Sequence, residues 1–217
     1  MVRKALLFAG CLALLGLAPA SAQASHRWGK YHWARPDTST TVDLVYSEGS
    51  GVSNWSSSSV RSDWNNFAPL VNGVKAVHIS TGSSGVDVTV SAGNYGNNGW
   101  VGLAQIAIGS GNHIVSGQIK LNTYYSITSD QRRSTYCMEA GHIFGLDHNN
   151  PGKRGGLPDN TCMNDYAWYT TPNSHDTDEL AIIYNHGDGY STFRGVRRQP
   201  SALVTIHRTS YAEAAAF

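Results

Sequence analysis

The sequence predicts an α+β domain with one mixed, five-stranded sheet, a helix that carries the candidate site and a C-terminal helix. Three observations predict this class: short runs of β-branched residues, longer stretches with helical spacing of apolar residues, and Gly- and Asn-rich segments between them. The expected order is strand, helix, four strands, helix, loop, helix.

Runs rich in Val, Ile and Leu mark the expected strands, at residues 41–46, 74–79, 86–90, 101–108 and 114–122. The third run shows the clearest alternation, because Asp87 and Thr89 separate its valines as in a half-buried strand. The stretch 91–100 is rich in Gly and Asn and is expected to be a loop.

The first helix is expected over residues 54–67, where large apolar residues recur at near-helical spacing: Trp55, Val60, Trp64 and Phe67. Such a stripe is more typical of a core-facing helix than of a ligand platform. The second helix is expected to begin at Asp130, a plausible N-cap, and to run to about Phe144. Gly145 can adopt the left-handed conformation that ends a helix.

A last helix is expected to be capped by Asp176 or Thr177 and to run through Tyr184, with Gly187 just past its end. Beyond about Tyr190 no strong pattern remains, so a poorly structured tail is expected. The chain is thus divided into a signal peptide, an N-terminal extension, one domain and a tail, at 1–24, 25–39, 40–187 and 188–217.

The first residues are typical of a secretory signal peptide. Arg3 and Lys4 precede an almost wholly apolar run, 5–17, and small residues offer cleavage sites near 22–24. The run is shorter than the roughly 20 residues that span a bilayer, which disfavours a membrane anchor. We therefore expect a secreted protein, extracellular or periplasmic, whose mature chain is a single domain.

Charge and cysteine content narrow the expected partners and compartment. The formal net charge of +1 becomes −1 without Arg3 and Lys4, and a near-neutral chain gives no support for a nucleic-acid or anionic-membrane partner. Of the three cysteines, Cys137 and Cys162 remain in the mature chain. In an oxidising compartment they most simply form one disulfide, with two buried free thiols as the alternative.

The strongest chemical signal is the run 137–148, Cys-Met-Glu-Ala-Gly-His-Ile-Phe-Gly-Leu-Asp-His. Residues four apart lie on the same face of a helix, so Met138 and His142 can approach one metal ion. Glu139 stands beside that face, where its carboxylate can reach a water molecule without binding the metal.

Glycine at 145 lets the chain turn sharply and bring His148 back toward the same ion. A hydrolytic zinc site needs three protein ligands and an open position for water. The metal lowers the pKa of that water toward ~7, and the glutamate takes its proton as it attacks a scissile carbonyl.

Glu139, His142, Gly145 and His148 together resemble the metzincin protease signature H-E-x-x-H-x-x-G-x-x-H. The family also has a methionine-containing turn below the metal, and Met163 within Thr-Cys-Met-Asn resembles this Met-turn. The resemblance is closest to matrixins and their bacterial secreted relatives. It implies a metzincin-like fold and zinc as the catalytic cofactor.

The likeness extends over roughly residues 40–187. Residues 103–106 resemble the edge strand that binds substrate backbone in matrixins, and 117–122 resemble the strand after it. A Cys137–Cys162 bond would link the site helix to the Met-turn. On the chain-entropy model, this bond would stabilise the folded state by roughly 3 kcal/mol.

Two positions depart from the family pattern. Met138 replaces the first histidine ligand, and a thioether is a soft ligand that suits Cu(I) better than zinc. His175 is the spare ligand expected if the site is rebuilt; otherwise His175 and His186 are interpreted as capping or surface residues. Gln105 stands where matrixins carry a structural-metal histidine, which leaves structural calcium or zinc open.

The expected function is that of a secreted, monomeric, zinc-dependent endopeptidase acting on proteins or peptides. Glu139 is the expected general base and His142 and His148 are two ligands, with substrate extended along strand 101–108. The alternative is a weak or inactive binding protein on the same scaffold, because the first histidine is missing. A third hypothesis is a copper site formed by Met138, His142 and His148.

Overall fold

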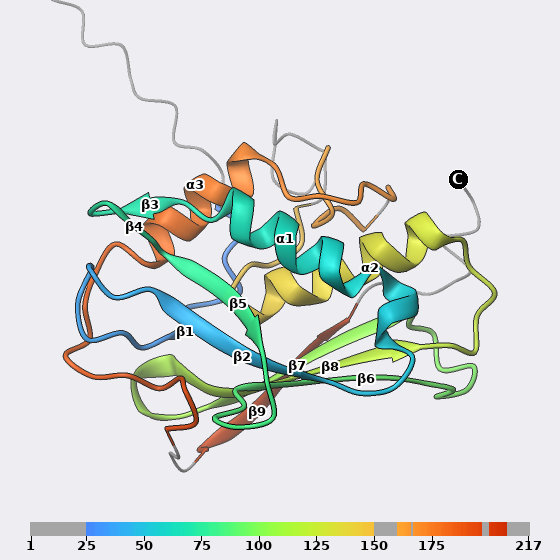
Figure 1. The fold of residues 1–217 in the computed structure, drawn as a ribbon, viewed down its shortest axis with the longest axis horizontal. Helices are drawn as coiled ribbons and strands as arrows, with labels where there is room; N and C mark the ends of the chain where they lie inside the picture. Colours follow the sequence, from blue (N-terminus) through green and yellow to red (C-terminus); the bar gives the residue numbers. More distant parts are fainter. Residues whose placement is uncertain (1–24, 150–159, 166, 197–199, 208–217) are drawn as a thin grey trace, which may run out of the picture.

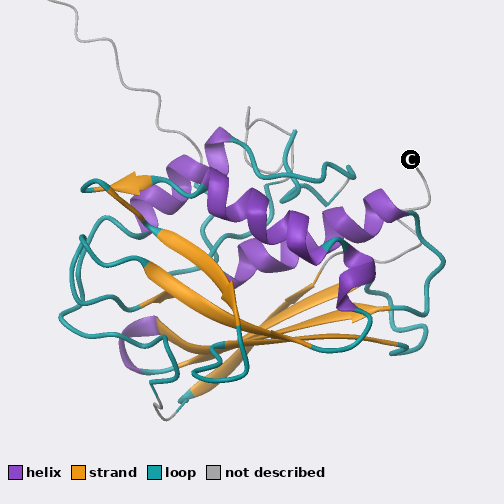
Figure 2. Ribbon diagram, viewed as in Figure 1, coloured by secondary structure: helices purple, strands orange, loops and turns teal. Residues whose placement is uncertain are grey.

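The computed structural model describes residues 25–149, 160–165, 167–196 and 200–207. The predicted signal peptide lies outside the described residues. Within them, the chain forms an α+β domain with a seven-stranded mixed sheet and three α-helices. The helices lie on one face of the sheet (Figures 1 and 2).

The strands are β1 (His32–Trp33), β2 (Val42–Glu48), β3 (Leu70–Val71), β4 (Val74–Lys75), β5 (Val77–Thr81), β6 (Val88–Gly93), β7 (Gly102–Ile108), β8 (His113–Asn122) and β9 (Ala202–His207). The helices are α1 (Ser57–Phe67), α2 (Ser129–Ile143) and α3 (Ser174–Ile183), with the short 3-10 helices η1 (Val52–Trp55) and η2 (Ser110–Asn112).

The sheet has the order β5-β2-β6-β8-β7-β9, and β1 pairs with the start of β8. Neighbours from β5 to β8 are parallel, whereas β7 runs antiparallel between β8 and β9. The α+β class and the mixed sheet are confirmed, but the predicted number of five strands is wrong. The five expected strands are present as β2, β5, β6, β7 and β8.

The two additional strands lie in segments for which no strand was expected. β1 has only two residues and falls in the predicted N-terminal extension, too short to show an alternating pattern. β9 falls in the predicted tail, so residues 202–207 correct that expectation. Both strands depend on partners far away in the sequence, and such pairing leaves no local signal.

The first expected helix is divided in two. Ser56, at φ 56°, separates η1 from α1, because a residue in the left-handed region interrupts helical geometry. Trp55, Val60 and Trp64 are buried as predicted, whereas Phe67 is 38% exposed and does not belong to the core stripe.

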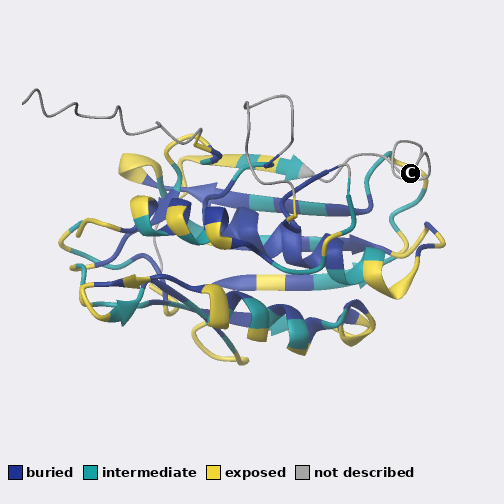
Figure 3. Cartoon of the chain, turned by 90° about the horizontal axis from the view of Figure 1, so that it is seen from above, coloured by how far each residue is buried: buried dark blue, intermediate teal, exposed yellow. Residues whose placement is uncertain are grey.

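Helix α2 begins with a capping box at Thr128 rather than with the predicted Asp130. The Thr128 hydroxyl accepts from the Gln131 N–H at 3.2 Å, and the Gln131 side chain accepts from the Thr128 N–H at 2.9 Å. The prediction for its other end is confirmed: α2 ends at Ile143, and Gly145 has φ 96°. The second half of α2 is buried throughout (Figure 3).

Helix α3 begins at Ser174 with Asn173 as its N-cap, in place of the predicted Asp176 or Thr177. The Asn173 carboxamide oxygen accepts from the N–H groups of His175 and Asp176 at 2.9 and 3.1 Å. Asp176 returns a bond by accepting from the Asn173 N–H at 2.9 Å. No helix in the described ranges has the length and apolar character needed to cross a membrane.

The segment before β2 is packed into the domain. Trp33 is fully buried, and its indole N–H donates to the Ile143 carbonyl at 2.8 Å, at the end of α2. Arg35 is also fully buried and donates to the carbonyls of Thr40, Tyr184 and His186. This segment therefore connects the end of α2 to the end of α3.

Candidate metal centre

Helix α2 and the turn after it bring His142 and His148 together. Their ring centroids are 4.8 Å apart, and the planes are tilted by 35°. Gly145 makes this return possible, because a Cβ there would lie 2.3 Å from the Tyr31 carbonyl oxygen. The expected convergence of the two histidines is thus present.

Each of these imidazoles is held through its Nδ1 atom. His142 Nδ1 is 2.8 Å from the Leu146 carbonyl oxygen, and His148 Nδ1 contacts the Asp165 carboxylate. Since both partners are acceptors, Nδ1 carries the proton in each neutral ring and Nε2 offers a lone pair. Outer contacts of this kind fix the orientation of metal-binding histidines.

The two Nε2 atoms are the unexplained feature of the site. Both are buried and have no hydrogen-bond partner in the part of the chain that the structure describes. A buried nitrogen without a partner is rare and costs about 1–3 kcal/mol, which an ion or ordered water would offset. Burial, and then the charge of His148, lowers the pKa of His142 well below its ordinary value and keeps this ring in the metal-binding form.

Glu139 is fully buried on α2 and lies against the start of β7. A Cβ added to Gly102 would be 2.4 Å from Glu139 Oε1 and 2.5 Å from Thr135 Cγ2. A glycine at this position therefore allows the carboxylate to reach the backbone of β7. This places the candidate base between the helix and the strand expected to bind substrate.

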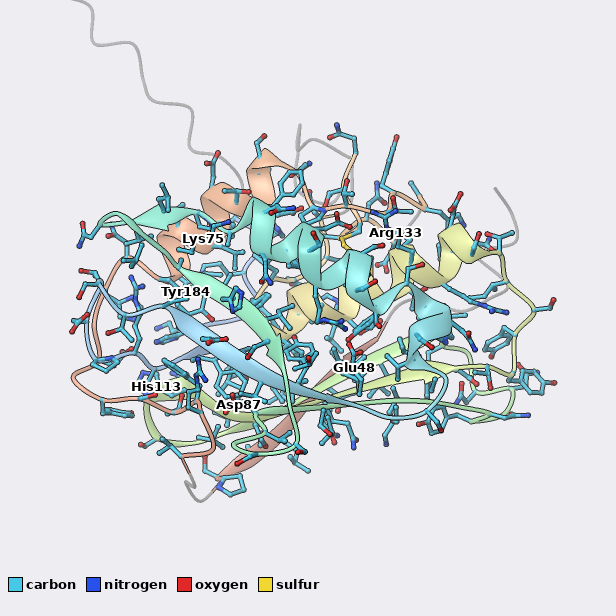
Figure 4. All side chains as sticks on the ribbon, viewed as in Figure 1. Glu48, Lys75, Asp87, His113, Arg133 and Tyr184 are labelled. Atoms are coloured by element: carbon cyan, nitrogen blue, oxygen red, sulfur yellow. A yellow bond between two sulfur atoms is a disulfide. The ribbon has the colours of Figure 1, made fainter. Side chains whose placement is uncertain are left out.

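Met163 packs against helix α2. A Cβ on Gly141 would be 2.4 Å from Met163 Sδ, so the turn methionine packs directly against the α2 backbone next to His142. The predicted disulfide between Cys137 and Cys162 is present, with 5.9 Å between the Cα atoms (yellow bond in Figure 4). It joins α2 to the Met163 turn.

Met138 stands where the motif has its first ligand. Met138 is fully buried, one helical turn before His142. Among the described residues, no group of three or more His, Cys, Asp or Glu ligand atoms includes His142 or His148. Within the described residues, the centre therefore offers two imidazole nitrogens, and the Met138 thioether is the remaining candidate ligand.

His175, the spare ligand considered from the sequence, belongs to another group. Its ring lies 4.7 Å from that of His26, whose Nε2 is 3.0 Å from Asp176 Oδ1. These three residues are fully or nearly fully buried and form one of the two clusters that could hold a metal in the described ranges.

The second cluster contains His32, His113 and Asp188, with His186 beside it. Sequence reasoning missed these residues and interpreted His186 as a capping or surface residue. They belong to separate elements and follow no motif spacing, so only the fold brings them together.

The expected substrate edge is already paired. β9 runs antiparallel along β7, with Ile108 opposite Ala202 and Leu103 opposite His207. The Gln105 side chain donates to the Thr205 hydroxyl of β9 at 3.0 Å. β9 thus pairs with β7 as far as Leu103, the residue after Gly102, where β7 begins next to Glu139.

Comparison with known proteins adds no relative: no family model matches the sequence, and no curated protein matches it.

Proposed function

We propose that this protein is a metzincin-like, zinc-dependent endopeptidase with its centre at His142 and His148. One observation carries the proposal: two buried Nε2 atoms, each opposite a fixed Nδ1, without hydrogen-bond partners in the described part of the chain. Neutral imidazoles are good zinc ligands, so these nitrogens fit the ion. Met138, at the first-ligand position of the motif, is the candidate for the third ligand.

Bound zinc supplies Lewis acidity that makes a water molecule nucleophilic near neutral pH. The Glu139 carboxylate would accept the proton of the attacking water and later give it to the leaving amine. Its position against Gly102 supports this role, because the carboxylate lies at the beginning of β7. Asp165 and the Leu146 carbonyl keep the two histidine rings oriented.

A substrate that binds along β7 requires β9 to leave this edge. The chain's own strand occupies the place where an added peptide strand would pair, through the register from Leu103 to Ile108. Access to the proposed centre therefore depends on how firmly residues 202–207 are held. Export of the mature chain, with the Cys137–Cys162 bond formed outside the cytoplasm, is part of the same proposal.

Two observations favour the alternative, a binding protein without catalytic activity. The centre lacks a third His, Cys, Asp or Glu ligand within the described residues, and β9 covers the substrate edge. In this alternative Glu139 has no chemical role, so its substitution leaves the protein's binding unchanged.

The test combines metal content with peptide cleavage by the purified protein. The proposal expects zinc bound at His142 and His148, and cleavage of an unstructured peptide library. Glu139→Gln should keep the zinc and lower the cleavage rate by about 10²–10⁴, the usual contribution of a general base. His142→Gln should lose the zinc of this centre and the cleavage.

His78→Gln is the matched control for the histidine variant. His78 contacts Asp43 at 2.9 Å in a histidine–carboxylate pair outside both metal clusters. Its substitution should change neither zinc content nor cleavage. Wild-type protein that takes up no zinc at this centre and cleaves no peptide refutes the proposal, and a Glu139→Gln variant as active as wild type refutes the role of Glu139.

A further inference from the structure

A second histidine cluster lies at the end of the sheet where β8 begins. His32 of β1 and His113 of β8 are directly opposite each other in the parallel pairing of these strands. Their rings are 4.7 Å apart and nearly perpendicular, at 89°. Figure 4 labels His113 at this place.

The loop after α3 brings two more side chains to these histidines. Asp188 Oδ1 lies 3.1 Å from His113 Nε2, 3.6 Å from His32 Nε2 and 3.4 Å from His186 Nε2. His186 Nε2 is also 3.1 Å from His32 Nε2. Three imidazole nitrogens thus surround one carboxylate oxygen.

We infer that His32, His113, His186 and Asp188 form a zinc site separate from the proposed catalytic centre. In a tetrahedral zinc site with bonds of about 2.0–2.1 Å, neighbouring ligand atoms lie roughly 3.3 Å apart. The separations of Asp188 Oδ1 from the three Nε2 atoms, and of His186 Nε2 from His32 Nε2, are 3.1 to 3.6 Å and agree with that spacing. Three imidazoles and one carboxylate are ligand types that zinc commonly takes.

The contacts behind the ligand atoms support the same conclusion. His32 Nδ1 is 2.9 Å from the Lys30 carbonyl oxygen, and His113 Nδ1 contacts the Tyr190 hydroxyl. Because the Lys30 carbonyl only accepts, His32 carries its proton on Nδ1 and its Nε2 offers a lone pair. Metal-binding histidines commonly have such a partner on the other ring nitrogen.

The carboxylate is held in the same way. Asp188 Oδ2 accepts from the Arg35 N–H at 3.0 Å, and the Asp188 N–H donates to the Arg35 carbonyl at 2.7 Å. Oδ1 is left to face the histidines. Backbone contacts therefore fix the loop onto the segment that carries His32.

Exposure gives the site an entry path. The side chains of His32, His113 and Asp188 are 10%, 12% and 9% exposed, whereas that of His186 is 43% exposed. The first three side chains are largely buried, and His186 can complete the site from the surface. Four protein ligands leave no open position for water, so the site is structural and joins β1, β8 and the loop after α3.

The experiment measures zinc binding by the purified protein after chelation and dialysis, with bound zinc counted at each added concentration. His186→Gln is the main variant, because an exposed side chain can be replaced without unfolding the domain. His113→Gln removes a second ligand, and Tyr190→Phe removes the hydroxyl behind His113. His78→Gln is again the matched control, and His142→Gln removes the other centre.

We expect wild type, His78→Gln and His142→Gln each to bind one equivalent of zinc at this site with the same affinity. His186→Gln and His113→Gln should bind that equivalent at least tenfold more weakly. Tyr190→Phe should weaken that equivalent by about 10–100-fold, as removal of an outer contact does. Zinc should raise the Tm of the control more than that of His186→Gln.

The inference is overturned if His186→Gln and His113→Gln bind zinc as tightly and in the same amount as His78→Gln. The same holds if wild type takes up zinc only at a site that His142→Gln removes. A protein with one equivalent of zinc that survives His142→Gln but not His186→Gln supports this site, even if the proposed protease activity is absent.

Discussion

Replacement of Gly102 by alanine should destabilise the domain through one defined contact. The new methyl would lie 2.4 Å from Glu139 Oε1, 2.9 Å from Glu139 Cδ and 2.5 Å from Thr135 Cγ2. Favourable carbon contacts are about 3.5–4.0 Å, so β7 and α2 must separate by roughly 1 Å or the side chains must move. Gly102 has no left-handed φ, so backbone strain does not contribute.

The expected magnitude follows from two opposing effects. Overpacking of a core costs about 1–3 kcal/mol. Alanine also has less conformational entropy than glycine in the unfolded chain, and this offsets about 0.4–1 kcal/mol of the cost. The variant should therefore lose about 1–2 kcal/mol in the free energy of unfolding, or about 2–8 °C in Tm for a domain of this size.

Urea unfolding followed by circular dichroism measures this change, with Gly49→Ala as the control. A Cβ at Gly49 would meet only the Val90 carbonyl oxygen, at 3.4 Å, so this variant should keep the full gain of about 0.4–1 kcal/mol from the unfolded chain. Thr135→Ser removes the clashing methyl and keeps the hydroxyl that donates to Gln131 at 2.8 Å. Gly102→Ala should therefore cost less in the Thr135→Ser background.

Two results would refute this reasoning. Gly102→Ala could unfold at the same urea concentration as Gly49→Ala, which would mean that the helix and strand separate without cost. Alternatively, the effects of Gly102→Ala and Thr135→Ser could simply add, although contacting residues usually show a coupling energy of about 0.5–3 kcal/mol.

Three further predictions concern the disulfide, a buried carboxylate and β9. Replacing both Cys137 and Cys162 by alanine should lower the free energy of unfolding by about 3 kcal/mol, and a reductant should destabilise wild type but not the variant. Burial raises the pKa of Asp87, so the folded state binds its proton more tightly than the unfolded state does. As pH rises from about 4 through the raised pKa, wild type should lose stability relative to Asp87→Asn, and a constant difference in urea unfolding would contradict this. Val204→Pro should unpair β9 and speed cleavage of an unstructured peptide, since each ~1.4 kcal/mol of lost pairing opens the edge about tenfold more often. The exposed Leu203→Ala should leave that rate unchanged, and equal rates for both variants would show that β9 does not limit access.

Local patterns in the sequence predicted the parts of the fold that depend on neighbouring residues. The central strands, the end of α2 at Gly145 and the buried stripe with Trp55 and Trp64 follow from periodicity and backbone preference. Thr128 was missed as the cap of α2, although Thr-x-x-Gln is a recognisable capping box and could have been found. Asn173, the cap of α3, was missed in the same way.

The remaining features depend on contacts between distant residues. Glu139, His142 and His148 could be identified because a helix and one turn fix their spacing. His32, His113 and Asp188 could not, since the pairing of β1 with β8 and the loop after α3 bring them together. The same explanation applies to β9, whose partner strand precedes it by about a hundred residues.

The buried guanidinium of Arg35 has a consequence for the order of folding. Its partners at Tyr184 and His186 are synthesised about 150 residues later, and β1 gains the Asp188 contacts only then. Contacts between such distant residues slow folding, because the long loop between them must close first. A nascent chain that has reached α2 still lacks two of the three carbonyls that accept from the Arg35 side chain, so the first segment of the domain is among the last to become ordered.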